Sequence, residues 1–125
     1  MEIYVYRAFV QRVIDGDTYV VTIDLGFNLS FNCKIRLLKV NTPEMTGKEK
    51  EKGRKSTEFV KDIIEGQYVY LKSANKTDSF GRWLAAIITE DGINLGDWIV
   101  EREMGEVMIM SHKKPWWKQL WDRLF

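Results

Sequence analysis

The stretch Arg36-Leu37-Leu38-Lys39-Val40-Asn41-Thr42-Pro43-Glu44 runs from an apolar strand pattern into a turn. Arg36 can hold a phosphate through two parallel charged hydrogen bonds, and Glu44 can accept a proton from water. Asn41 and the carbonyl oxygen of Thr42 are oxygen donors of the kind that hard cations bind. The stretch therefore combines three functions that the hydrolysis of a phosphodiester needs within a few ångströms of one another.

Two other fragments extend this pattern, and they read Asp15-Gly16-Asp17-Thr18 and Thr77-Asp78-Ser79-Phe80-Gly81-Arg82. With the central stretch they resemble the fingerprint of the staphylococcal-nuclease-like (thermonuclease) family: D-G-D-T, then R-L-x-x-V-D-T-P-E, then T-D-x-[YF]-G-R. Order and spacing agree, and the resemblance covers the chain up to about Met110. One position departs from the fingerprint, because Asn41 stands where the family usually has aspartate.

Length and composition bound the class of protein. The chain has 125 residues, 45% of them hydrophobic and 13% aromatic, which indicates one folded domain over residues 1–125 and excludes a disordered chain. No apolar run approaches the roughly 18 residues of a membrane helix, and no signal-peptide pattern opens the chain, so we expect a cytoplasmic protein. The single cysteine, Cys33, cannot form an internal disulfide and is expected to be a small core side chain.

The first half of the chain predicts three strands and a helix. Apolar alternation favours strands at about 4–14, 18–23 and 29–40, with a hairpin turn at Asp15-Gly16-Asp17 between the first two. The period of two places Arg36, Leu38 and Val40 on one face of the third strand. Residues 45–53 are expected to form a polar loop, followed by a helix from about Arg54 to Ile64 that ends at Gly66.

The second half predicts two strands and two helices. The strands are expected at 68–71 and 83–88, and a helix capped by Asn94 is expected to end at Gly105. A Trp-rich helix is predicted at about 115–124. These elements indicate an α+β, mainly β, domain built as a five-stranded barrel with about three helices. The family resemblance implies the same architecture, an OB-fold barrel.

The resemblance also assigns catalytic roles. It implies that Arg36 and Arg82 bind the scissile phosphate and that Glu44 activates the attacking water. Phe80 takes a position where many members have tyrosine, which implies a contact with the substrate. Each residue has a plainer interpretation: the arginines could form ordinary surface ion pairs, and Thr-Pro-Glu is also a typical helix start. The polar sequence after Glu44 argues against a helix there.

Calcium ligation is the second implication of the resemblance. Asp17 matches a calcium ligand of the family, whereas on its own it reads as a turn aspartate. Asn41 and the Thr42 carbonyl would complete the protein's share of the oxygen ligands. Because asparagine brings no charge, we expect a weaker metal site than in the family pattern.

We therefore expect a monomeric, calcium-dependent phosphodiesterase, an endonuclease acting on DNA or RNA with little sequence specificity. The alternative is a nucleic-acid-binding OB-fold module in which Asn41 has weakened or removed catalysis. A third hypothesis is a protein-interaction domain that uses the Trp-rich tail.

Overall fold

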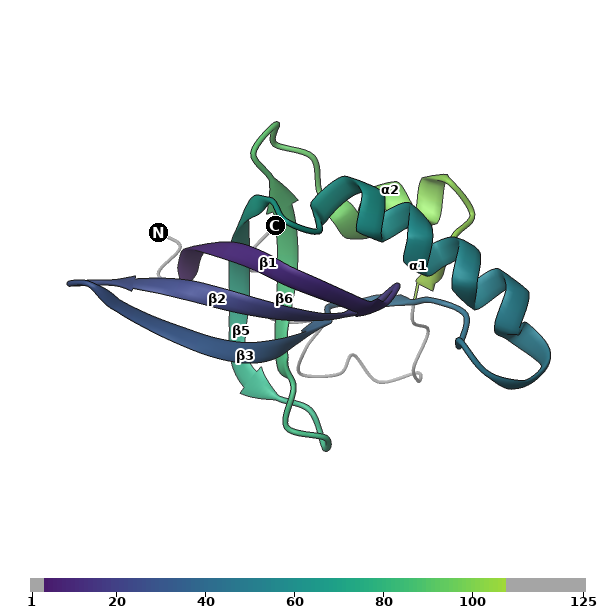
Figure 1. Ribbon diagram of the computed structural model, residues 1–125, viewed down its shortest axis with the longest axis horizontal. Coiled ribbons are helices and arrows are strands. Elements are labelled where there is room, and N and C mark those ends of the chain that lie inside the picture. Colours follow the sequence, from purple (N-terminus) through teal and green to yellow (C-terminus); the bar gives the residue numbers. More distant parts are fainter. Residues whose placement is uncertain (1–3, 108–125) are drawn as a thin grey trace.

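The computed structural model describes residues 4–107 (Figure 1). Its elements, in chain order, are β1 (Val5–Asp15), β2 (Thr18–Gly26), β3 (Leu29–Leu37), β4 (Val40–Asn41), a short 3-10 helix (Gly47–Glu49), α1 (Lys50–Ile64), β5 (Tyr68–Thr77), β6 (Trp83–Thr89), α2 (Leu95–Glu101) and β7 (Glu106–Val107). The predicted Trp-rich helix at 115–124 lies outside the described residues. No helix within residues 4–107 is long and apolar enough to cross a bilayer.

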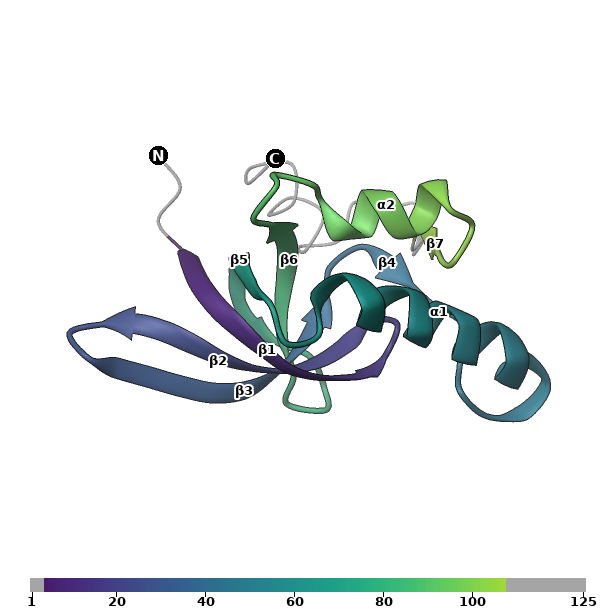
Figure 2. The same ribbon diagram turned by 45° about the horizontal axis from the view of Figure 1, so that its top comes forward.

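Five strands close into a barrel in the order β1-β2-β3-β6-β5. All neighbours are antiparallel except β3 and β6, which run parallel through Ile35–Leu37 and Trp83–Ala85. Two views show β2 and β3 projecting as a long hairpin on one side, whereas α1 and α2 lie together on the opposite side (Figures 1 and 2). The mainly β, five-stranded OB-type barrel predicted from the sequence is therefore confirmed.

The core fills the barrel interior and the space under the two helices. Alternating residues of the strands point inward, with Tyr19, Val21 and Ile35 at most 1% exposed. Val60 and Ile64 of α1, and Leu95 and Ile99 of α2, are fully buried against this core. Cys33 is half-buried and packs against the same cluster, and its burial raises the pKa of the thiol to about 11.

The third predicted strand is broken where the sequence suggested continuity. β3 ends at Leu37, Leu38 and Lys39 form a turn, and β4 starts at Val40. Lys39 has a positive φ of 67°, and the Leu38 amide donates to the carbonyl of Ala85 at 2.9 Å. The expected common face of Arg36, Leu38 and Val40 on one strand is therefore wrong, because the turn interrupts the period of two.

The first helix begins earlier than predicted. Residues 45–53 were expected as a loop, but Gly47–Glu49 form a 3-10 turn and α1 already starts at Lys50. The first turn of α1 is exposed on most sides, so the sequence there carries no apolar period. Glycine at position 53 lets α1 lie against the backbone of Glu44, because a Cβ at this position would lie 2.0 Å from the carbonyl oxygen of Glu44. This close approach packs α1 against the segment that carries Glu44.

The ends of the helices agree with the sequence in two cases out of three. Gly66 follows α1 with a φ of 74°, as a C-terminal glycine should. Asn94 caps α2 by accepting a hydrogen bond from the amide of Asp97 at 3.1 Å. Gly105, however, does not end α2, because the helix stops at Glu101 and Glu103 takes the left-handed conformation with φ 58°.

Replacing Gly53 by alanine should destabilise the fold by about 2 kcal/mol, since overpacking of a closed contact outweighs the gain in helix propensity. Denaturant unfolding monitored by circular dichroism measures the change. Lys52→Ala, at an exposed neighbouring position of α1, is the matched control and should change stability by less than about 0.5 kcal/mol. A Gly53→Ala protein as stable as wild type would show that α1 does not press on the Glu44 segment.

Candidate active site

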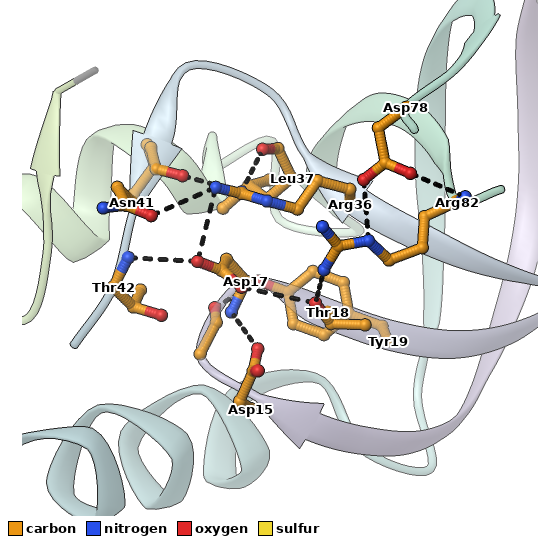
Figure 3. Close-up of polar contacts among 12 residues, drawn as sticks. Asp15, Asp17, Thr18, Tyr19, Arg36, Leu37, Asn41, Thr42, Asp78 and Arg82 are labelled. Carbon is orange, nitrogen blue, oxygen red and sulfur yellow. Dashed lines mark hydrogen bonds and ion pairs between the residues drawn. The ribbon is translucent and has the colours of Figure 1, made fainter. Parts of the chain in front are cut away.

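Asp17 lies at the centre of a polar network that joins three separate segments of the chain (Figure 3). It lies in the β1–β2 turn and is only 7% exposed. Its Oδ2 atom accepts the amide of Thr42 at 3.1 Å and lies 3.5 Å from Nη2 of Arg36. Its Oδ1 atom accepts the hydroxyl of Thr18 at 3.3 Å. Both oxygens of the carboxylate thus accept from donors, and these contacts offset the free-energy cost of burying its charge.

Glycine at position 16 allows this arrangement. A Cβ on Gly16 would lie 2.7 Å from side-chain atoms of Thr42, so any larger residue would push the β1–β2 turn away. The close approach brings the turn against the segment after β4. The hairpin predicted at residues 15–17 is confirmed, and it also serves to place Asp17 beside Thr42.

Arg36 is buried at the end of β3 with its guanidinium among oxygen atoms. Nη1 donates to the carbonyls of Leu37 at 2.7 Å and Val40 at 2.8 Å, and Nη2 donates to Oδ1 of Asn41 at 3.3 Å. The turn at residues 38–39 therefore wraps around the guanidinium. Because it also faces Asp17, Arg36 connects both residues that the sequence proposed as side-chain metal ligands.

Arg82 reaches the same network from the β5–β6 turn. Its Nε atom donates to Oδ2 of Asp78 at 2.7 Å, and its Nη1 atom donates to the hydroxyl of Thr18 at 2.8 Å. Partial burial alone would raise the pKa of Asp78, but hydrogen bonds from the amides of Arg82 and Phe80 and from the guanidinium lower it below its usual value. Asp78 therefore stays ionised and anchors the Nε atom of Arg82.

Phe80 stands at the tip of this turn. Its side chain is 82% exposed, and its ring centroid lies 5.4 Å from Cζ of Arg82. Gly81, with a φ of 78°, turns the chain between the two residues. An exposed aromatic ring beside an arginine is a surface on which a nucleotide base can stack.

Asp15 adds a second carboxylate next to Asp17. Burial is the main cause that raises the pKa of Asp15 to about 6, and the neighbouring Asp17 contributes in the same direction. Oδ1 of Asp15 also accepts the amide of Asp17 at 3.1 Å, which closes the turn. Asp15 thus places a second acidic group beside Asp17.

The donor atoms present fit a hard cation. Oδ2 of Asp17 and Oδ1 of Asn41 both lie within 3.5 Å of Nη2 of Arg36, so two of the three predicted ligand residues lie close together on either side of that guanidinium. Thr42, whose carbonyl is the third, is tied to Asp17 through its amide. All three donors are oxygens, as calcium prefers. Within residues 4–107 there is no group of three or more His, Cys, Asp or Glu side chains suited to a metal, so the ligand set is poor in charge.

Glu44 is the one candidate that the contacts do not join to the network. It is exposed, and no hydrogen bond or ion pair among residues 4–107 involves its carboxylate. Its backbone is nevertheless fixed on two sides, because Gly53 packs against its carbonyl and Thr42, two positions earlier, is bound to Asp17. The helix-start interpretation of Thr42-Pro43-Glu44 is wrong, since these residues lie in no helix.

Sequence reasoning missed three contributors to this network. Thr18 links Asp17 to Arg82, Asp78 orients Arg82, and Asp15 closes the turn before Asp17. Asp78 and Thr18 both belong to the quoted motifs, and that membership was the signal that could have found them. The two carbonyls that bind Arg36 had no signal in the sequence, because backbone atoms carry no residue identity.

Comparisons with known proteins place the chain in a family. The family model described as staphylococcal nuclease homologue matches residues 34–120. Endonuclease YhcR of Bacillus subtilis (strain 168) is 32% identical over 100 residues, which are 72% of this chain and 8% of that protein. A protein of Escherichia coli O157:H7 described as an uncharacterized endonuclease is 32% identical over 91 residues, 73% of this chain and 54% of that protein. This chain thus spans about half of one relative and a small part of the other, and it belongs to the family of staphylococcal nuclease homologues.

Proposed function

We propose that this protein is a calcium-dependent endonuclease that hydrolyses phosphodiester bonds in DNA or RNA with little sequence specificity. The observation that carries the proposal is the connected network in which Asp17 contacts Arg36 directly and reaches Arg82 through Thr18. Two guanidinium groups on one network suit a phosphate that gains negative charge during reaction. Membership of the nuclease family and the two relatives named as endonucleases support the same chemistry.

The reaction we infer is the attack of water on phosphorus. Glu44 accepts a proton from the water, the oxygen of the water forms a bond to phosphorus, and the bond from phosphorus to the leaving oxygen breaks. Arg36 and Arg82 stabilise the charge that develops on the phosphoryl oxygens, and Arg82 assists the leaving oxygen. In keeping with the family, the product would carry a 3′-phosphate. The exposed position of Glu44 leaves its carboxylate able to reach a bound substrate.

Asp17, Asn41 and the carbonyl of Thr42 would hold the calcium ion. When bound there, the ion supplies positive charge that orients the phosphate and makes phosphorus more electrophilic. Phe80 would contact a base next to the cut position. Contacts to phosphate and to one face of a base carry little sequence information, which is the physical basis for the low specificity.

The direct test is plasmid nicking in calcium, with excess EDTA as the metal-free condition. We expect cutting in calcium, none in EDTA, and a loss of about 10²–10⁴-fold in rate for Glu44→Gln, which removes the general base. Because Glu44 is exposed, this variant should unfold at the same denaturant concentration as wild type. Glu58→Gln, at an exposed position of α1, is the matched control and should keep full activity. Equal cutting by Glu44→Gln would remove Glu44 from the mechanism.

Replacing Arg82 by lysine should lower the cleavage rate by about 10²–10³-fold, since lysine keeps the charge but lacks the planar fork that binds phosphate and Asp78 together. Rates at saturating DNA measure the effect. Arg12→Lys, at an exposed position of β1, is the control for the same substitution elsewhere. An Arg82→Lys enzyme within a factor of three of wild type would mean that the guanidinium does not act on the phosphate.

Asn41→Asp should increase calcium affinity by about tenfold and raise turnover, because an added carboxylate restores one negative charge at the metal. Isothermal titration with calcium gives the affinity, and the nicking assay gives the turnover. Gln67→Glu adds the same charge at an exposed residue before β5 and should leave both quantities unchanged. If neither affinity nor turnover improves in Asn41→Asp, position 41 is not a metal ligand.

One observation favours a second candidate function. Oδ1 of Asn41 already accepts a hydrogen bond from Arg36, and the site has a single carboxylate among its proposed ligands. If calcium binds too weakly to act, the barrel would be a module that grips nucleic acid without cutting it. Salt-sensitive binding of single-stranded DNA with no cleavage in millimolar calcium would favour this function over the enzyme.

A further inference from the structure

Thr18 occupies a special place in the sheet. It is the first residue of β2 and is 4% exposed. It pairs with Asp15 on β1 and with Arg36 on β3, so it lies between two strands that both carry charged residues of the site. Directly paired residues point to the same face of a sheet, which places the Thr18 side chain on the face of Arg36.

The hydroxyl of Thr18 has two partners with opposite requirements. Arg82 can only donate a hydrogen bond, and its Nη1 atom does so to Oγ1 at 2.8 Å. The carboxylate of Asp17 can only accept, and Oγ1 donates to its Oδ1 atom at 3.3 Å. Because a hydroxyl has one proton and Arg82 cannot accept it, the hydroxyl proton of Thr18 points toward Oδ1 of Asp17 (Figure 3). A single polar atom thus connects an anion and a cation that do not touch each other.

The contact limits the motion of Arg82. Asp78 holds the Nε atom, which leaves the guanidinium able to turn about the bond from Nε to Cζ. Among residues 4–107, Thr18 is the only hydrogen-bond partner of the two terminal nitrogens of Arg82. Without the Thr18 hydroxyl, the terminal nitrogens would lose their fixed direction although the side chain would stay attached to Asp78.

We propose that Thr18 is a positioning residue that sets the direction of the Arg82 guanidinium relative to the carboxylate of Asp17. Its contact with each is a hydrogen bond, and it needs no contact with the substrate. The catalytic consequence rests on the proposed nuclease function, but the effect on Arg82 does not. Thr18 therefore links Arg82, which is proposed to bind the phosphate, to Asp17, which is proposed to bind the cation.

Arginine side-chain NMR tests the structural part without any activity. In wild type, the bond to Thr18 should slow rotation about Nε–Cζ, so the two terminal nitrogens of Arg82 should give separate ¹⁵N signals. Thr18→Val, of the same shape but without a hydroxyl, should merge them into one averaged signal, whereas Thr18→Ser should keep them separate. Thr18→Ala gives the same test if the valine variant does not fold. Separate signals in the variants that lack a hydroxyl would overturn the proposal.

Thr22 provides a matched control on the same strand. Its hydroxyl also has two partners, accepting from Gln11 at 3.2 Å and donating to Asn32 at 2.6 Å, but it lies four positions further along β2. Thr22→Val removes two hydrogen bonds of the same kind and should leave the signals of Arg82 unchanged. A merged Arg82 signal in this variant would show a general loosening of β2 and would overturn a specific role for Thr18.

Kinetics test the catalytic consequence. Thr18→Val should lower kcat about tenfold, the usual effect of one hydrogen bond to a charged group, with KM changed less than about twofold. Thr18→Ser should restore most of the rate. In an Arg82→Ala background, Thr18→Val should have no further effect, because the residue through which it acts is gone. Additive losses would overturn action through Arg82. If wild type cuts nothing in calcium, the nuclease proposal fails, and the NMR result alone decides the role of Thr18.

Discussion

The buried carboxylate of Asp17 is the constraint on which the site depends. A charge removed from water costs several kcal/mol unless donors replace the lost hydration. Here the donors come from distant points of the chain: the amide of Thr42, the hydroxyl of Thr18 and the guanidinium of Arg36. Meeting the needs of one carboxylate therefore fixes the relative positions of the β1–β2 turn, β3 and the segment after β4. The buried charge thus ties these three parts of the chain together.

Arg36 shows how the site also shapes the fold. Its guanidinium donates to the carbonyls of Leu37 and Val40, and the chain turns between them. The break between β3 and β4 is thus the way in which the backbone supplies acceptors to a buried cation. The same guanidinium faces Asp17 and Asn41, so aspartate at position 41 would add a second anion beside it. With asparagine instead of aspartate, one negative charge fewer lies beside the guanidinium, which favours its binding of a phosphate.

The sequence predicted the features that depend on spacing and on local chemistry. Alternating apolar residues indicated the barrel strands. The three motifs indicated which residues form the site, and among these Arg36 contacts both Asp17 and Asn41 directly. It could not predict the turn at residues 38–39, because apolar residues continue through Leu37 and Leu38 and hide the change of direction. The first turn of α1 was missed because an exposed turn needs no apolar period. The need for glycine at position 53 follows only from the structure, in which the carbonyl of Glu44 lies against it.

The central claim is that Asp17 and Asn41 share one cation site. NMR of their side-chain carbonyl carbons during a calcium titration tests this most directly and needs no substrate. We predict that the signals of both residues shift together along one binding curve, with the exposed carboxylates of Asp24 and Glu58 changing little. A titration that moves the signals of Asp24 and Glu58 while Asp17 stays unchanged would contradict this claim.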